Sequence, residues 1–554
     1  MAKKHEEYLK YLFDSECKIF TGSELVKKIC ENFSECTQVN ARKIIQNSVA
    51  KGIMKSTKPI TFGHKQYVYY GNQFDLSFNF IKNILKENRP GLYRIINRMY
   101  ENDGVISYFE IFKISGCLRN KTTSKVNTIS QLIKILEDLK LAKKMCEYDS
   151  GTTYLVAYNM EESDAIYRMR ENICELRLDS TFIPSFLIWL QKHNFLYNKN
   201  IVYRSKDRPA EGAVLNNLIW DAVGYTSTTG FCEYIGEVND EKRTVIVLDF
   251  KVSNMYNIDD LHGFYDRIQV YRNSVTDKNS KRKILPIIVT NEISDEVKVE
   301  IKKLKMLLFN LGTVFGERIY EVIQDYKKMS FMDVEYNDFI SKIEDILSIL
   351  KESGQEENLG NLKGELFERL IDSVIRRIYR KDIIKLQHSV IFGGFNQESK
   401  KRERYEFDYL LETEDEFIIF ELKGYKGTSF IRKGEFNEET QKPEKNTLKW
   451  FFSLTYPFAK KYIIAKEGLN PKPVRACYIT TARFDSEALE VLEKINNSKD
   501  KPNDLDIYYD GTKLLNLLEK YNLHREIKVI KQYYRPVIEN EYKYNHVNEF
   551  NSTF

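Results

Sequence analysis

The feature that most constrains this chain is the segment from Phe407 to Lys423, which reads FDYLLETEDEFIIFELK. Its two apolar runs flank a short acidic turn, and this pattern predicts the two strands of a hairpin. Glu421 and Lys423 are two residues apart on the second strand, so their side chains leave the same face of the sheet. The hairpin brings Asp408 of the first strand close to that face. The sequence therefore predicts two carboxylates and an ammonium together at the end of an apolar strand.

Such a group of side chains suggests a metal site. Two neighbouring carboxylates repel each other unless a cation lies between them, and hard oxygen ligands favour Mg²⁺, for which Mn²⁺ can substitute. A lysine beside the metal can lower the pKa of a bound water or stabilise charge that develops on a phosphate. We therefore expect Asp408 and Glu421 to bind the metal and Lys423 to take part in catalysis. The alternative is a solvent-exposed hairpin held by salt bridges.

The pattern Asp408, then Glu421-x-Lys423, resembles the PD-(D/E)xK nucleases, the restriction-endonuclease-like superfamily. The proline that names the motif is absent, because Phe407 precedes the aspartate. Upstream, apolar residues share one helical face over 362–378, and the pattern there is similar to the first helix of Mrr-like restriction endonucleases. The resemblance implies that Glu368, near the border of that face, completes the site. Glu365 points more nearly opposite the face and is expected to remain in solvent.

The segments that follow the hairpin have the same order as in the Mrr-type catalytic domain. Residues 474–481 (VRACYITT) predict a buried strand, and 484–488 open a helix. Residues 505–511 then predict a strand that ends in Asp-Gly and leads into a further helix. The resemblance covers roughly 361–525. It implies an endonuclease that hydrolyses phosphodiester bonds of double-stranded DNA and leaves a 5′-phosphate, in restriction or antiviral defence.

Composition sets wider bounds. A chain of 554 residues, with 42% hydrophobic and 30% charged residues, should fold into several domains. No apolar run is long enough to span a membrane and the N-terminus lacks a signal-peptide core, so we expect no membrane partner and a place in a prokaryotic cytoplasm. The eight cysteines form no CxxC pair, which favours reduced thiols and argues against zinc. A net charge of +5 permits a nucleic-acid partner without requiring one.

Residues 1–74 have the pattern of a winged-helix domain. Thr21 and Thr37 could each cap a helix, and two short strands then surround a glycine. Arg42 and Lys43 would lie on the recognition helix and contact DNA. The alternative is a partner-binding domain with ordinary solvated charges.

The pattern recurs in residues 75–160. A helix over 89–102 is followed by a short strand and helix that ends near Gly116, and Thr123 or Ser124 could cap the next helix. Lys121 and Lys125 would then lie at the start of a second recognition helix, where phosphates also favour the helix N-terminus. Two winged helices ahead of a nuclease resemble restriction enzymes that separate recognition from cleavage.

After a helical connector at 161–205, residues 206–330 suggest an internal duplication of the nuclease fold. Residues 211–219 resemble 363–371, which places Asn216 where Glu368 stands. In the predicted hairpin, Glu233 takes the place of Asp408, and Asp249 with Lys251 keeps the D-x-K form. Losing a charged ligand should weaken metal binding, so we expect a degenerate copy. An active second site, or a merely generic α/β pattern, remains an alternative.

The remaining segments complete the predicted organisation. A helical linker at 331–360 precedes the nuclease domain at 361–525, and a tail follows at 526–554. Lys401, Arg402 and Arg404 precede the Asp408 strand and could contact the phosphate backbone. The predicted architecture is thus α/β and α+β, with two winged-helix-like units ahead of two restriction-endonuclease-like folds. Double-strand cleavage would need a homodimer or two binding events. A nuclease subunit of a transposition or defence complex, or a non-catalytic DNA-binding scaffold, remains an alternative.

Overall fold

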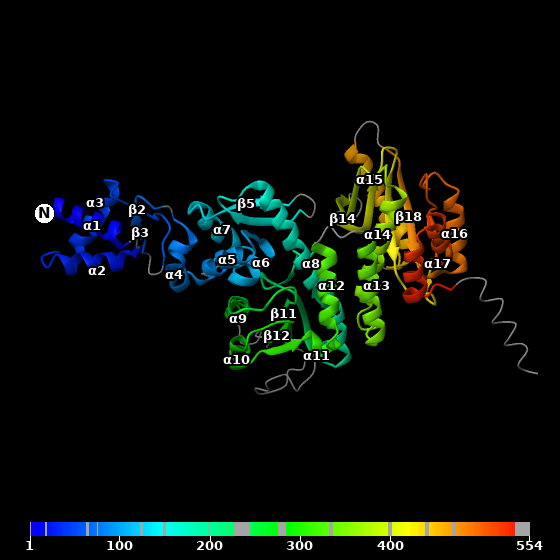
Figure 1. Cartoon of the computed structure of the whole chain (residues 1–554), viewed down its shortest axis with the longest axis horizontal. Coiled ribbons are helices and arrows are strands. Elements are labelled where there is room, and N and C mark those ends of the chain that lie inside the picture. Colours follow the sequence, from blue (N-terminus) through cyan, green and yellow to red (C-terminus); the bar gives the residue numbers. More distant parts are fainter. Residues whose placement is uncertain are drawn as a thin grey trace, which may run out of the picture. The chain divides into compact units, whose positions relative to one another are not determined.

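The computed structural model describes residues 2–16, 19–62, 66–74, 76–121, 126–147, 151–197, 199–226, 244–274, 284–331, 336–396, 401–437, 442–467 and 472–537. The chain divides into two compact units, Met1–Val314 and Phe315–Phe554. Both units combine helices with small β-sheets (Figure 1), so the expected mixed α/β, multidomain architecture is confirmed at that level.

The first unit begins with a module whose helix ends follow local capping signals. Thr21 caps α2 through a reciprocal capping box with Glu24, and Thr37 caps α3, both as predicted. The strands pair in the order β1-β3-β2. Helix α1 has no counterpart in the predictions. The elements are α1 (Ala2–Glu16), β1 (Phe20–Thr21), α2 (Gly22–Asn32), α3 (Gln38–Ala50), β2 (Met54–Ser56) and β3 (Val68–Gly71).

A second module repeats this order of helices and strands, with one additional helix at its start. Ser107 and Glu110 form a capping box on α6, which ends at Gly116 with a φ of 67°. Helix α7 is capped by Thr128, so the prediction of Thr123 or Ser124, which lie outside the described residues, was wrong. The strands pair in the order β4-β6-β5. The elements are α4 (Phe78–Asn88), α5 (Pro90–Glu101), β4 (Val105–Ser107), α6 (Tyr108–Ser115), α7 (Ile129–Asp138), β5 (Ala142–Cys146) and β6 (Thr153–Ala157).

The rest of the first unit is a long helix followed by a five-stranded sheet in the order β13-β12-β11-β10-β7. All residues of β11 except the last are buried, as expected of a central strand covered on both faces. Helices α9 and α10 pack against Val245 and Val247 of β11. The elements are α8 (Glu162–Lys192), β7 (Val202–Tyr203), β8 (Ala213–Leu215), β9 (Leu218–Trp220), β10 (Ala222–Thr226), β11 (Thr244–Lys251), α9 (Ile258–Ser274), β12 (Ile284–Thr290), α10 (Asp295–Lys303), β13 (Leu307–Asn310) and α11 (Leu311–Phe315).

The predicted alignment of residues 211–219 with the helix at 363–371 is wrong. These residues form the antiparallel hairpin β8–β9, and Asn216 and Asn217 occupy its turn with φ values of 49° and 63°. Asparagine tolerates this left-handed conformation better than most residues, which suits a two-residue hairpin turn. Asn216 is therefore no counterpart of Glu368. The helix that precedes the first sheet is α8.

The second unit contains a five-stranded sheet in the order β14-β15-β16-β18-β20. The predicted hairpin is present as β15 and β16, and Asp485 and Asp510 cap the helices after it. The elements are α12 (Ile319–Phe331), α13 (Tyr336–Glu352), α14 (Gly360–Ile378), β14 (Lys385–Asn396), β15 (Lys401–Glu412), β16 (Phe417–Lys423), β17 (Phe430–Ile431), the π-helix η2 (Trp450–Thr455), α15 (Tyr456–Glu467), β18 (Val474–Thr480), β19 (Arg483–Phe484), α16 (Ser486–Asn496), β20 (Tyr508–Tyr509), α17 (Gly511–Lys520), α18 (His524–Val529) and the π-helix η3 (Ile530–Tyr534).

The two five-stranded sheets share one pattern of strand directions. In the first, β7, β10 and β11 pair antiparallel, and β11, β12 and β13 pair parallel. In the second, β14, β15 and β16 pair antiparallel, and β16, β18 and β20 pair parallel. Strand β11 therefore corresponds to β16, and β10 corresponds to β15. The repeat suggested by the sequence has this structural counterpart, and Asp249 and Lys251 lie on its strand β11 as predicted. The partner strand β10 and the preceding helix α8 differ from the segments predicted.

Candidate functional site

The second sheet brings Asp408, Glu421 and Lys423 together. The β15–β16 register runs to Tyr409 opposite Phe420, so Asp408 and Glu421 are the next residues on the two strands. Asp408 Oδ2 accepts the Leu422 amide proton over 2.6 Å. Lys423 Nζ lies 2.8 Å from Glu421 Oε1 and 3.5 Å from Asp408 Oδ2. The three side chains are only 15–20% exposed. The ammonium thus bridges two shielded carboxylates at the end of β16.

The negative charge of the two carboxylates exceeds the positive charge of the one lysine beside them. Burial raises the pKa of Glu421 to about 7, and Asp408 adds to the shift, while Lys423 opposes it. Burial lowers the pKa of Lys423, but Asp408 and Glu421 outweigh burial and hold that pKa well above its usual value. Lys423 therefore remains an ammonium, and Glu421 can bind a proton near neutral pH.

The donor chemistry of the carboxylate pair fits a divalent cation. Asp408 and Glu421 supply hard oxygen ligands, and their net negative charge beside Lys423 would be relieved by a metal ion. Glu368 lies on α14. Side chains alternate along β15, and Tyr409, which neighbours Asp408, donates its hydroxyl to the Glu368 carbonyl over 3.2 Å, so α14 borders the opposite face. Among the described residues, no three His, Cys, Asp or Glu side chains are arranged to hold a metal. Glu368 as third ligand remains a prediction of the resemblance.

The expectation that Glu365 remains in solvent is wrong. Its side chain is buried, with a relative exposure of 4% for the residue. It accepts a short hydrogen bond from the Tyr326 hydroxyl, and Arg369 Nη2 lies 3.4 Å from the same oxygen. Helices α12 and α13 pack near α14 and cover the side of it that the sequence pattern leaves to solvent. Glu365 is thus part of the core of the second unit.

The residues predicted to contact DNA are placed on separate elements. Arg42 and Lys43 are exposed on α3, and Arg404 is exposed on β15. Lys121 is exposed beside a loop whose Arg119 and Asn120 amides donate to Asn217 of the β8–β9 turn. Lys125 lies outside the described residues, and so do the side chains of Lys401 and Arg402.

The predicted second site is present in part. Asp249 and Lys251 lie at the end of β11, as Glu421 and Lys423 lie at the end of β16. Glu233 lies outside the described residues. The acid beside Asp249 is Asp221, which directly precedes β10 and which the sequence argument missed. Its only signal in the sequence is its place just before a buried apolar strand. The carboxylate that α8 brings to the end of β11 is Asp179, whose Oδ1 accepts the Val252 and Ser253 amide protons.

Comparisons with known proteins add little to this geometry. No protein-family model matches the chain, and no curated protein is significantly similar to it. The solved structure of protein VC1899 from Vibrio cholerae aligns with 50% of this chain and 74% of that chain, at 15% sequence identity and a TM-score of 0.22. So low a score supports no conclusion about fold or function. Within the described ranges, no helix combines the length and apolar character needed to cross a membrane.

The raised pKa of Glu421 makes a prediction about stability. The pKa of about 7 in the folded protein exceeds the ordinary value of 4.5, so the folded state holds a proton that the unfolded state releases. In metal-free protein, the proton on Glu421 therefore stabilises the folded state below pH 4.5, and this stabilisation is lost as pH rises through 7. Glu421→Gln cannot ionise. As pH rises from 4.5 to 8, the free energy of unfolding of this variant should therefore increase by about 2–3 kcal/mol relative to that of the wild type.

Urea unfolding in EDTA, followed by hydrogen exchange of peptides from β15 and β16, measures this difference. The comparison at acidic pH serves as the internal control, because Glu421 is then protonated in both states. A constant difference between variant and wild type across the pH range would contradict the prediction.

Proposed function

We propose that this chain is a metal-dependent DNA endonuclease of the PD-(D/E)xK type, with its cleavage site on the second sheet. The observation that carries the proposal is the convergence of Asp408, Glu421 and Lys423 at the end of β16. The order and directions of the strands in that sheet also support it. Restriction or antiviral defence is the biological role that fits such an activity.

Each of the three residues has a distinct role in this proposal. Asp408 and Glu421 would hold Mg²⁺ or Mn²⁺, with Glu368 as the further ligand that the resemblance implies. When bound, the metal would lower the pKa of a water and stabilise negative charge on the phosphate. Lys423 has a permanent positive charge at this position, so its ammonium can orient the attacking water or stabilise the phosphorane-like charge during in-line displacement.

The N-terminal modules are proposed to be winged helices that bind double-stranded DNA. Helix α3 presents Arg42 and Lys43 to solvent, and a groove of about 740 Å³ beside it is lined by Lys27, Gln38 and Tyr69 among others. Basic and amide side chains on an exposed helix suit phosphate and base contacts. One cleavage site per chain would require a homodimer, or a second engagement, for a double-strand break.

A non-catalytic DNA-binding scaffold is the second candidate, and one observation favours it. Lys423 already lies between the two carboxylates, and among the described residues no third acid joins them. A nuclease subunit that awaits a partner of a transposition or defence complex would have the same appearance. In either case the purified chain would bind DNA without cutting it.

Cleavage of supercoiled plasmid with Mg²⁺, Mn²⁺ or EDTA tests the proposal. Wild type should cut only with metal, and Asp408→Asn should reduce the rate by roughly 10³-fold, because a metal ligand is lost. Glu412→Gln is the matched control, since Glu412 lies on the same strand but pairs with Lys472. Wild-type DNA binding without metal-dependent cleavage would favour the scaffold.

A further inference from the structure

The first sheet carries a full counterpart of the Asp408, Glu421 and Lys423 group. The β10–β11 register runs to Ala222 opposite Leu248, so Asp221 and Asp249 are the next residues. Asp221 Oδ2 accepts the Phe250 amide proton over 2.9 Å, in the way that Asp408 Oδ2 accepts that of Leu422. Asp221, Asp249 and Lys251 therefore correspond in position to Asp408, Glu421 and Lys423.

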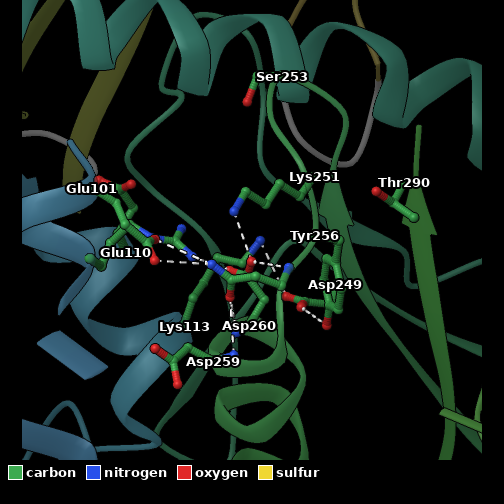
Figure 2. Close-up of polar contacts among 12 residues, drawn as sticks. Glu101, Glu110, Lys113, Asp249, Lys251, Ser253, Tyr256, Asp259, Asp260 and Thr290 are labelled. Carbon is green, nitrogen blue, oxygen red and sulfur yellow. Dashed lines mark hydrogen bonds and ion pairs between the residues drawn. The ribbon is translucent and has the colours of Figure 1, made fainter. Parts of the chain in front are cut away.

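The cation between the two acids differs between the sheets. In the first sheet it is Lys113 of α6, whose Nζ lies 2.6 Å from Asp221 Oδ2 and 3.2 Å from Asp249 Oδ1. Lys113 Nζ also donates to the Phe250 carbonyl over 3.1 Å. Lys251, which has the position of Lys423, turns away and pairs with Asp260 of α9 over 2.7 Å, as Figure 2 shows.

The other oxygens of the acid pair are also occupied. Arg204 Nε donates to Asp221 Oδ1 over 2.8 Å, and Arg267 Nη2 donates to Asp249 Oδ1 over 2.7 Å. The Tyr256 hydroxyl donates to Asp249 Oδ2 over 2.8 Å (Figure 2). Asp221 and Asp249 are 0% and 1% exposed, so water cannot replace these partners. Carboxylates so fully bonded to cations and donors have no oxygen left for a metal ion.

The residues around this cluster join the second module to the sheet. Arg98 of α5 pairs with Asp260 over 2.7 Å, and Arg94 of α5 pairs with Asp266 of α9. At Gly263 a Cβ would lie 2.6 Å from Ile114 Cα, so α6 and α9 approach as closely as a glycine allows. The ammonium of Lys113 thus reaches the acid pair across a tightly packed, ion-paired contact.

We propose that the first sheet holds a metal-free copy of the acidic site, in which the Lys113 ammonium takes the place of a cation and fixes α5 and α6 on the sheet. The acid pair then acts as an anchor for the second module and takes no part in cleavage. A buried ion pair is costly to break from one side, because the remaining charge is left without a partner. The anchor role rests on contacts within the first unit and holds whether or not the second sheet is catalytic.

Hydrogen exchange of the full chain tests the anchor. Lys113→Met removes the charge but keeps the length of the side chain, and amides of α5 and α6 should exchange roughly 100-fold faster or more. Lys113→Arg, which keeps the charge, should restore most of the protection. Lys134→Met, at an exposed position of α7, is the matched control and should exchange like the wild type. Unchanged exchange of α5 and α6 in Lys113→Met would overturn the anchor role.

Mn²⁺ binding tests the absence of metal from the first sheet. The double variant Asp408→Asn/Glu421→Gln is titrated with Mn²⁺ and followed by electron paramagnetic resonance. We expect no specifically bound Mn²⁺ in this variant. Bound Mn²⁺ that disappears on further substitution of Asp249→Asn would overturn the proposal. If instead the proposed nuclease site were wrong, the result would differ, because the wild type itself would then bind no Mn²⁺ through Asp408.

Discussion

Lys423→Met is expected to reduce DNA cleavage by about 10²–10³-fold while Mn²⁺ still binds. Lys423 Nζ lies 2.8 Å from Glu421 Oε1 and 3.5 Å from Asp408 Oδ2, so its loss leaves the two carboxylates intact. Their mutual repulsion then increases, and the metal no longer competes with an ammonium for their oxygens. Affinity for Mn²⁺ should therefore be equal to or higher than that of the wild type. Single-turnover cleavage and Mn²⁺ titration separate the two effects.

The comparison with Asp408→Asn makes this prediction specific. That variant should lose cleavage and Mn²⁺ affinity together, because Asp408 is a proposed ligand. Lys426→Met is the control for a nearby lysine, since Lys426 is exposed and pairs with Glu357. If Lys423→Met cut DNA at the wild-type rate, the ammonium would have no part in the chemistry. If it lost metal binding as well, Lys423 would support the site structurally.

Arg267→Met should destabilise the first unit by about 3–5 kcal/mol. Arg267 is fully buried, and its guanidinium donates to Asp249 Oδ1 and to the Ile219 carbonyl. Methionine fills much of the space but leaves the Asp249 carboxylate short of positive charge at a site that is shielded from solvent. Urea unfolding followed by hydrogen exchange of peptides from β11 and α9 measures the change.

Two further variants test whether lost charge or lost packing causes the destabilisation by Arg267→Met. Arg272→Met lies on the same helix but is exposed, so it should change the free energy of unfolding by less than about 0.5 kcal/mol. The double variant Arg267→Met/Asp249→Leu removes both charges and should recover much of the lost stability. If the loss of stability in the double variant equalled the sum of the losses in the two single variants, lost packing would explain the effect.

Features that depend on neighbouring residues could be predicted from the sequence. The hairpin of β15 and β16 follows from two apolar runs around an acidic turn, and the caps at Thr21 and Thr37 follow from their side chains. Side-chain alternation placed Glu421 and Lys423 on one face. These inferences hold because capping, alternation and turn formation act over a few residues.

Pairings between distant segments could not be predicted in this way. Asp221 could not be identified as the partner of Asp249, because segment 227–243 separates their strands and Glu233 within it offered a plausible acid. The burial of Glu365 depends on Tyr326, which lies in a helix that no local sequence pattern places beside α14.

The candidate site of the second sheet could be located from the sequence, because Asp408 comes from one strand and Glu421 and Lys423 from the next, and a short hairpin is enough to assemble them. The state of the first sheet depends on contacts that form only in the folded chain. There the cation between the acids comes from Lys113, 108 residues before Asp221, on a helix of another module. Coulombic attraction depends on distance in space, and no local pattern records which remote side chain will supply the charge.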